Sequence, residues 1–146
     1  MIKNERQYRI TKAQAVRFEQ TLRETSKRNA AIAPPSVLDR AQEEALASQL
    51  ADLRTEVSEY EALRSGQVTS FQADTFGELP AALIKARIAT GMSQKDLAAQ
   101  LGVKEQQVQK YEATDYASAS FKRLSAIICV LGVKVREEIS LTERQT

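Results

Sequence analysis

The fold of this chain is decided by residues 93–112, which read SQKDLAAQLGVKEQQVQKYE. Ser93 followed three residues later by Asp96 is a capping pattern that starts a helix. Gly102 tolerates the positive φ that ends a helix sharply. A second helix is expected to follow at once, with Val108 buried on its inner side. The stretch therefore predicts two short helices joined by a tight turn at a steep angle.

The crossing of these two helices calls for a small side chain at the contact, and Ala98 is placed to provide it. The expected core of the unit consists of Leu97, Ala98, Leu101, Gly102, Val108 and Tyr111. The outward face of the second helix is then polar, long and flexible, and comprises Lys104, Glu105, Gln106, Gln109 and Lys110.

With these parts in place, residues 79–131 resemble the helix-turn-helix of phage Cro/cI-type repressors, often called XRE-like. The resemblance rests on Ser-Gln-x-x-Leu-Ala-x-x-Leu-Gly-Val at 93–103 and on Val108-x-x-Tyr111-Glu112. It implies an all-α, five-helix domain over residues 79–140. Two features depart from the family pattern: Lys104 stands where Ser or Thr usually caps the recognition helix, and residues 113–118 replace an Asn-Gly turn.

The resemblance also implies which side chains meet DNA. The base-reading positions are Glu105, Gln106, Gln109 and Lys110, where Gln suits adenine, Lys suits guanine and Glu accepts from cytosine. The backbone contacts implied are Gln94, Lys95, Lys104 and Lys122, with Lys85 and Arg87 as further phosphate neighbours. In this family a Gln at the position of Gln94 also braces the recognition helix. The alternative to a phosphate contact, for each of these Lys and Arg side chains, is an ordinary solvated charge on the protein surface.

Residues 1–65 are expected to form two long helices separated by Pro34-Pro35. Thr11 predicts the start of the first helix, and Ser36 with Asp39 predicts the start of the second. An a/d seam on the second helix comprises Leu46, Leu50, Leu53, Val57 and Tyr60. The seam either packs on the first helix of the same chain or meets a second copy. We favour a dimerisation or partner-binding module, since a two-helix unit alone has a thin core.

Two further segments lack a helical rhythm. Residues 66–78 are expected to be a linker, bracketed by Gly66 and Gly77. Residues 133–139 alternate apolar and polar side chains, which is typical of a half-exposed strand. Such a strand would pair with its symmetry mate or with the stretch near Phe71; otherwise the segment is a frayed tail.

Composition excludes several classes of chemistry. The chain has 146 residues, no His and one Cys, so imidazole catalysis, disulfide frameworks and multi-thiolate metal sites are excluded. Cys129 lies in an apolar run and is expected to be inert packing. We expect no enzyme, no cofactor, no metal and no membrane segment, and a cytoplasmic location.

Charge is segregated along the chain. Residues 1–33 carry eight Lys or Arg against three Asp or Glu, residues 36–65 carry three against seven, and residues 79–134 carry eight against four. The basic C-terminal block permits contact with a polyanion. The basic N-terminal block either pairs with the acidic helix beside it or offers a second such surface.

Taken together, these patterns predict a dimeric, sequence-specific transcriptional regulator that binds an inverted-repeat operator in double-stranded DNA. The small size and the absence of an evident sensor domain also resemble the HigA-type antitoxins of bacterial toxin-antitoxin systems. Residues 1–65 would then dimerise or cover a partner toxin. The alternatives are a phage-like repressor without a toxin, and a protein-interaction adaptor that does not bind DNA.

Overall fold

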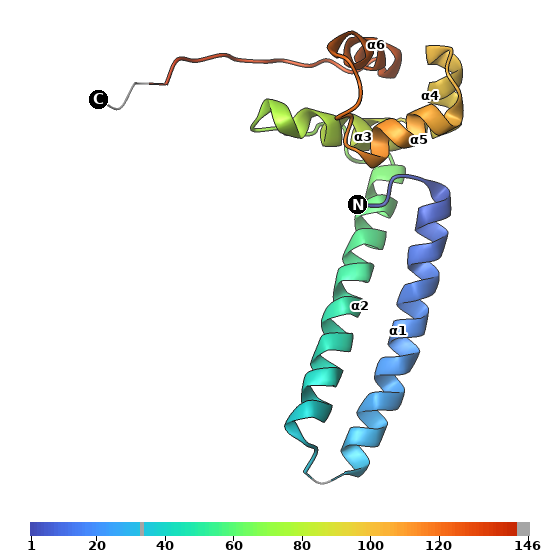
Figure 1. The fold of residues 1–146 in the computed structure, drawn as a ribbon, viewed down its shortest axis with the longest axis vertical. Coiled ribbons are helices and arrows are strands. Elements are labelled where there is room, and N and C mark those ends of the chain that lie inside the picture. The colour runs from blue at the N-terminus through green and yellow to red at the C-terminus, as the bar shows by residue number, and fades with distance from the viewer. Residues whose placement is uncertain (33, 143–146) are drawn as a thin grey trace.

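The computed structural model describes residues 1–32 and 34–142, and within those ranges all regular structure is helical. Two long helices, α1 (Glu5–Ala31) and α2 (Val37–Arg64), form a hairpin that projects from a cluster of short helices (Figure 1). That cluster consists of the single-turn 3-10 helix η1 (Phe76–Glu78), α3 (Leu79–Ala89), α4 (Gln94–Leu101), α5 (Glu105–Ala113) and α6 (Phe121–Leu131). The all-α prediction is confirmed. Four α-helices, preceded by η1, stand where five helices were expected.

The first helix begins earlier than its sequence signal suggested. Asn4, rather than Thr11, is the N-cap of α1, and its side-chain oxygen accepts a hydrogen bond from the backbone N–H of Gln7 at 2.8 Å. The Gln7 side chain in turn accepts from the backbone N–H of Lys3 at 2.9 Å. Thr11 lies inside the helix, on its partly buried face. The start at Ser36 is confirmed, because Ser36 and Asp39 form a complete capping box.

The apolar seam of α2 faces α1 of the same chain. Leu50 is only 3% exposed and Tyr60 6%, while Leu46, Leu53 and Val57 are partly buried. The matching face of α1 repeats with the same heptad spacing and comprises Tyr8, Thr11, Ala15, Phe18, Leu22, Thr25 and Asn29. The pairing within one chain, which was the alternative at the sequence level, is therefore the arrangement in this structure. No helix in the described residues has the length and apolarity needed to cross a membrane.

Polar contacts join the two helices at the tip of the hairpin. Asn29 is buried and donates to the carbonyl of Asp39 at 3.1 Å and to Oε2 of Glu43 at 3.0 Å. The Ser26 hydroxyl donates to the other oxygen of Glu43. These hydrogen bonds hold the pKa of the Glu43 carboxyl below its ordinary value. Buried polar pairs of this kind fix the register of two helices more than they add stability.

Aromatic side chains join the two helices at the root of the hairpin. The rings of Tyr8 and Tyr60 stack with centroids 5.1 Å apart, and the Arg64 guanidinium lies within 6 Å of both rings. Tyr8 donates its hydroxyl hydrogen to Glu61, which Lys12 also approaches at 3.2 Å. Because Tyr60 also belongs to the main core, this cluster ties the hairpin to the short helices.

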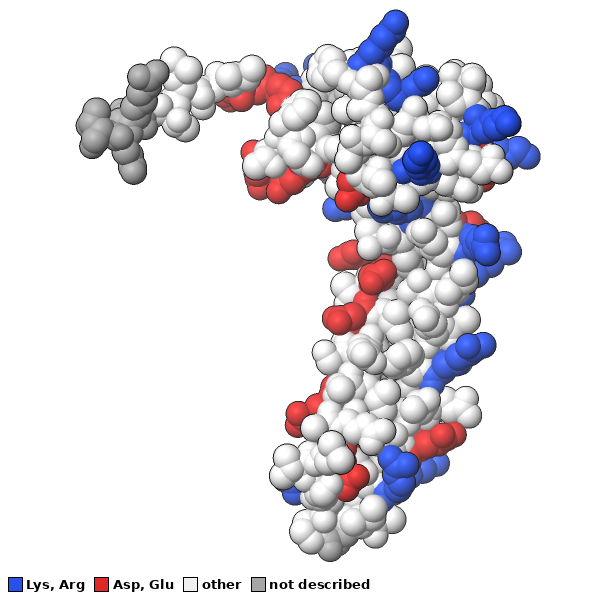
Figure 2. Space-filling model, in the orientation of Figure 1, with Lys and Arg blue, Asp and Glu red and all other residues white. Residues whose placement is uncertain are grey.

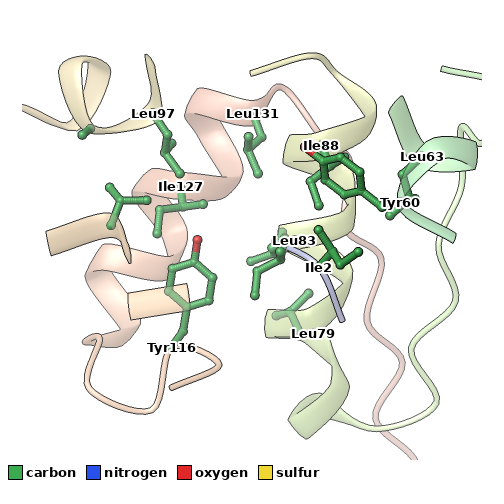
Figure 3. Packing of buried hydrophobic residues seen from close by; sticks show 13 residues of the cluster. Ile2, Tyr60, Leu63, Leu79, Leu83, Ile88, Leu97, Tyr116, Ile127 and Leu131 are labelled. Carbon is green, nitrogen blue, oxygen red and sulfur yellow. The ribbon is translucent and has the colours of Figure 1, made fainter. Parts of the chain in front are cut away.

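One hydrophobic core spans the root of the hairpin and the short helices. Ile2 is 3% exposed and lies with Tyr60 and Leu63 in the same cluster as Leu79 and Leu83 (Figure 3). The deepest members of the core, with less than 2% exposure, include Ile84, Leu97, Val108 and Ile127. Ile2 therefore helps to build the core of the domain formed by residues 76–131.

The C-terminal segment is extended but forms no strand. After Gly132, residues 133–137 pass along α3, and the segment then runs away from the domain as far as residue 142 (Figure 1). Ile139 and Leu141 are 94% and 97% exposed. A lone extended segment has no partner for its backbone N–H and C=O groups, so the expected strand at 133–139 is not formed within one chain.

Candidate nucleic-acid interface

Helix α4 is fixed at both ends by the signals read in the sequence. The Ser93 hydroxyl accepts from the backbone N–H of Asp96 at 3.0 Å, and the Asp96 carboxylate accepts from the backbone N–H of Ser93 at 3.0 Å. The Ser93 hydroxyl also donates to this carboxylate at 2.7 Å, and this bond, together with the one from the Ser93 backbone, holds the pKa of the Asp96 carboxyl below its ordinary value. At the other end Gly102 has φ +70°, and the N–H of Val103 returns to the carbonyl of Ala98 at 3.0 Å. The turn between α4 and α5 is thereby set.

The crossing of α4 and α5 is closed by small and β-branched side chains. Leu97, Ala98 and Val108 are each no more than 2% exposed, while Leu101 and Tyr111 are partly buried. Tyr111 stacks on Tyr116 with ring centroids 6.1 Å apart. These positions match the expected core of the two-helix unit.

Helix α5 presents a polar face to solvent. Its N-terminus at Lys104 has no side-chain cap, as expected. Four exposed side chains lie along the outer face: Glu105, Gln106, Gln109 and Lys110. The carboxylate of Glu105 accepts a hydrogen bond from the Gln109 amide at 3.3 Å, which orients this pair along the helix. The structure therefore brings the expected base-reading residues together on one surface.

Gln94 is turned into the protein. Its side chain is buried, with 5% exposure, and its amide donates to Oε2 of Glu112 at 2.7 Å while its oxygen accepts from Asn4 at 3.1 Å. Since Glu112 belongs to α5, this bond braces α5 against α4. A contact of Gln94 with the DNA backbone stays a prediction. Lys95, Lys104 and Lys122 are exposed, as backbone contacts require.

A buried ion pair behind α5 was not anticipated. Arg87 was expected near phosphates, but it is 3% exposed and its guanidinium meets both oxygens of the fully buried Glu112, at 2.9 Å for Nη2. Its remaining N–H groups donate to the carbonyls of Met92 and Lys3. The expectation that Arg87 lies near phosphates is wrong, because its guanidinium is buried and hydrogen-bonded inside the fold. Arg87 lies between Ala86 and Ile88 on a largely apolar helix, and this placement is the sequence feature that indicates a buried side chain.

The first residues of the chain close the same network. The ammonium group of Lys3 donates to the carbonyl of Glu112 and lies 3.2 Å from Oδ1 of Asp115. Asp115 and Tyr116 both adopt positive φ, of 47° and 59°. They form the tight turn that replaces the Asn-Gly turn of the family. Burial raises the pKa of the Tyr116 hydroxyl above its ordinary value.

The loop after this turn ends at the start of α6. Ser120 caps α6, because its hydroxyl accepts the backbone N–H of Arg123 at 3.1 Å. Cys129 is exposed on α6 rather than packed in the core, contrary to expectation. Helical rotation places its neighbours Ile127 and Leu131 inward instead.

Positive side chains are spread over the domain that holds this site (Figure 2). Figure 2 shows Lys and Arg on the domain and along the α1 edge of the hairpin, whereas Asp and Glu lie mainly along the α2 edge. This segregation agrees with the charge blocks of the sequence.

Comparison with protein families agrees with this geometry. Residues 83–137 match the family model described as Helix-turn-helix. This part of the chain is thus similar to helix-turn-helix domains. The match supports the resemblance to Cro/cI-type regulators, and the hairpin of α1 and α2 lies outside the matched residues. No curated protein and no solved structure matches the chain.

The buried pair predicts a large stability effect. Replacement of Glu112 by Ala leaves the Arg87 guanidinium buried without its partner, so the free energy of unfolding is expected to fall by about 3–5 kcal/mol. Chemical unfolding followed by circular dichroism measures this change. The matched control is Glu105→Ala on the exposed face of the same helix, expected to change stability by about 0.5 kcal/mol or less. Equal effects of the two substitutions would contradict the role of the pair.

Proposed function

We propose that this protein is a sequence-specific transcriptional regulator that binds an inverted-repeat operator as a homodimer. The observation that carries the proposal is the exposed polar face of α5, held in place by the buried core and by the Arg87–Glu112 pair. The helix-turn-helix match supports DNA binding and regulation of transcription. The domain division at 1–65, 66–78 and 79–140 is part of the same proposal.

The chemistry of the exposed face suits the edges of base pairs in the major groove. Gln106 and Lys110 lie one turn apart, so their side chains can reach neighbouring bases, Gln toward adenine and Lys toward guanine. Glu105 can accept from the exocyclic amine of cytosine. The exposed Lys95, Lys104 and Lys122 would supply affinity through phosphates without sequence information.

Two monomers must be held so that their recognition helices lie about 34 Å apart on one face of the duplex. The apolar seam of α2 is already covered within the chain, so we place the contact between copies at the C-terminal segment. Residues 68–71, Ala73 and residues 133–137 line a groove of about 550 Å³ beside α3. Lys134, Arg136 and Glu137 lie at the groove, and beyond it the exposed tail carries Glu138 next to Ile139 and Leu141. Opposite charges and apolar side chains would thus meet when two tails pair antiparallel.

We also propose that the regulator is an autorepressing antitoxin. The observation that favours this role is at the tip of the hairpin, where Val37 and Leu38 are 85% and 78% exposed. Exposed apolar side chains at the far end of an arm of about 40 Å suit a partner protein that does not touch the DNA. A repressor without a toxin, and an adaptor without DNA affinity, are the competing functions. The carboxylate of Glu105 favours the adaptor, because a negative charge on this face repels the phosphates of DNA.

Base reading predicts a difference between two substitutions. Gln106→Ala is expected to cost about 1–3 kcal/mol on the operator and to relax one base position, whereas Lys104→Ala should weaken all sequences alike and lower the salt slope by about 1. Gel shifts with the upstream DNA, at two or more salt concentrations, measure both effects. Equal losses on operator and random DNA for Gln106→Ala would refute its base-reading role. Failure of the unaltered chain to bind any duplex at low salt would favour the adaptor.

Tail pairing predicts the oligomeric state. The double substitution Ile139→Asp with Leu141→Asp is expected to convert the dimer to a monomer in sedimentation velocity, because four carboxylates would enter the apolar contact. Both side chains are exposed in the monomer, so its fold should persist. Ser140→Asp, between them on the opposite side of the extended chain, is the control and should leave the dimer intact. A dimer that survives the double substitution would move the contact to another surface.

The antitoxin role predicts a growth phenotype. A growth-arresting protein is expected from the adjacent reading frame, and co-expression of this chain should restore growth. Replacing both Val37 and Leu38 by Ser is expected to abolish the rescue while operator binding persists. Val16→Ser, at an apolar position of α1 that is 62% exposed, serves as the control. Rescue by the tip variant at the normal level would place the partner elsewhere, and a neighbour that does not arrest growth would argue for a repressor without a toxin.

A further inference from the structure

A groove of about 400 Å³ separates the root of the hairpin from the helix-turn-helix. Arg6 and Arg64 line it from the hairpin, and Ser93, Gln94, Glu105 and Gln109 line it from α4 and α5. Two of these residues, Glu105 and Gln109, belong to the face that is proposed to read bases. The groove is thus the place where the long hairpin borders the candidate DNA surface.

The hairpin root is firmly anchored beside this groove. Ile2 is buried in the main core, the carbonyl of Lys3 accepts from Arg87, and the Asn4 amide donates to Gln94 at 3.1 Å. Asn4 is also the N-cap of α1, so the first turn of the helix starts from a fixed point. Arg6 lies on that first turn, two residues beyond the anchor.

The ion pairs around the groove leave the guanidinium of Arg6 free to bind an anion. The carboxylate of Glu5 is taken up by Arg64 at 2.8 Å and by Arg9 at 3.5 Å, and Arg64 also lies over the Tyr8 and Tyr60 rings. Arg6 is exposed and forms no ion pair with any residue in 1–32 or 34–142. Glu105, on the far side of the groove, repels a phosphate unless a cation compensates for it. Arg6 is the groove residue suited to do so.

We propose that the root of the hairpin is a second part of the DNA-binding surface, in which Arg6 contacts a backbone phosphate of the duplex seated on α5. The inference rests on the proposed function. A phosphate contact of this kind positions the protein on the duplex and adds affinity, while the bases beside it are read by Glu105 and Gln109. It also gives the basic N-terminal block a role that the helix-turn-helix alone does not provide.

The test compares two arginines of α1 in the full-length chain. Arg6→Ala should weaken binding to operator and random duplexes alike and reduce the slope of log affinity against log salt by about 0.9. Arg17→Ala is the matched control, because Arg17 is exposed on the same helix about 16 Å farther from the groove. Arg6→Lys, which keeps the charge, should retain most of the slope. Fluorescence anisotropy with labelled duplexes between 50 and 200 mM salt measures all four proteins, and circular dichroism checks their fold.

The outcomes separate this contact from the proposed function. If the unaltered chain binds DNA and Arg6→Ala behaves like Arg17→Ala, the phosphate contact at the hairpin root is overturned and the proposed function stands. If Arg6→Ala changes the preference among operator sequences rather than the salt slope, Arg6 reads bases and the phosphate assignment is overturned. If the unaltered chain binds no duplex, both the function and the contact fall together.

Discussion

The structure depends on one buried ion pair, between Arg87 of α3 and Glu112 of α5. Burial of two charges is costly unless each finds partners for all of its hydrogen-bonding groups. Here the guanidinium meets both oxygens of Glu112 and two carbonyls, while the carboxylate also accepts from Gln94 of α4. The pair therefore joins α3, α4, α5 and the start of the chain at a single point. The hydrogen bonds of Glu112 on the inner face of α5 therefore fix the position of the outer face of the same helix.

Local signals account for what could be read from the sequence. Ser93, Gly102 and the spacing of Leu97 and Val108 define α4 and α5 within twenty residues, so the motif and its exposed face were predictable. The pairing of Arg87 with Glu112 joins residues 25 positions apart, and the link to Lys3 joins residues 84 apart. No local sequence pattern predicts contacts between residues so far apart. A lone Arg in an apolar helix does indicate that the Arg side chain needs a buried partner.

The hairpin shows a different limit. Heptad spacing identified the seam on α2 but did not show which helix covers it. The opposing face of α1 mixes apolar residues with Thr11, Thr25 and Asn29, so its own pattern is weak. The start of α1 was misplaced for a related reason. Thr11 was the signal read in the sequence, but the helix starts at Asn4, where Ile2 and Asn4 are themselves held by the domain. Tertiary contacts decided between two locally acceptable starts.

The place of Ile2 and Lys3 in the domain has a kinetic consequence. Lys3 meets Glu112 and Asp115 across 109 and 112 positions of chain, so these contacts are far from local. The entropy of closing so long a loop must be met before these contacts contribute stability, and rates of folding fall as contacts become less local. The hairpin forms by local contacts and brings the two ends of α1 and α2 together, which shortens the effective loop. A hairpin formed first would therefore lower the entropy cost of closing the contact between Lys3 and Glu112.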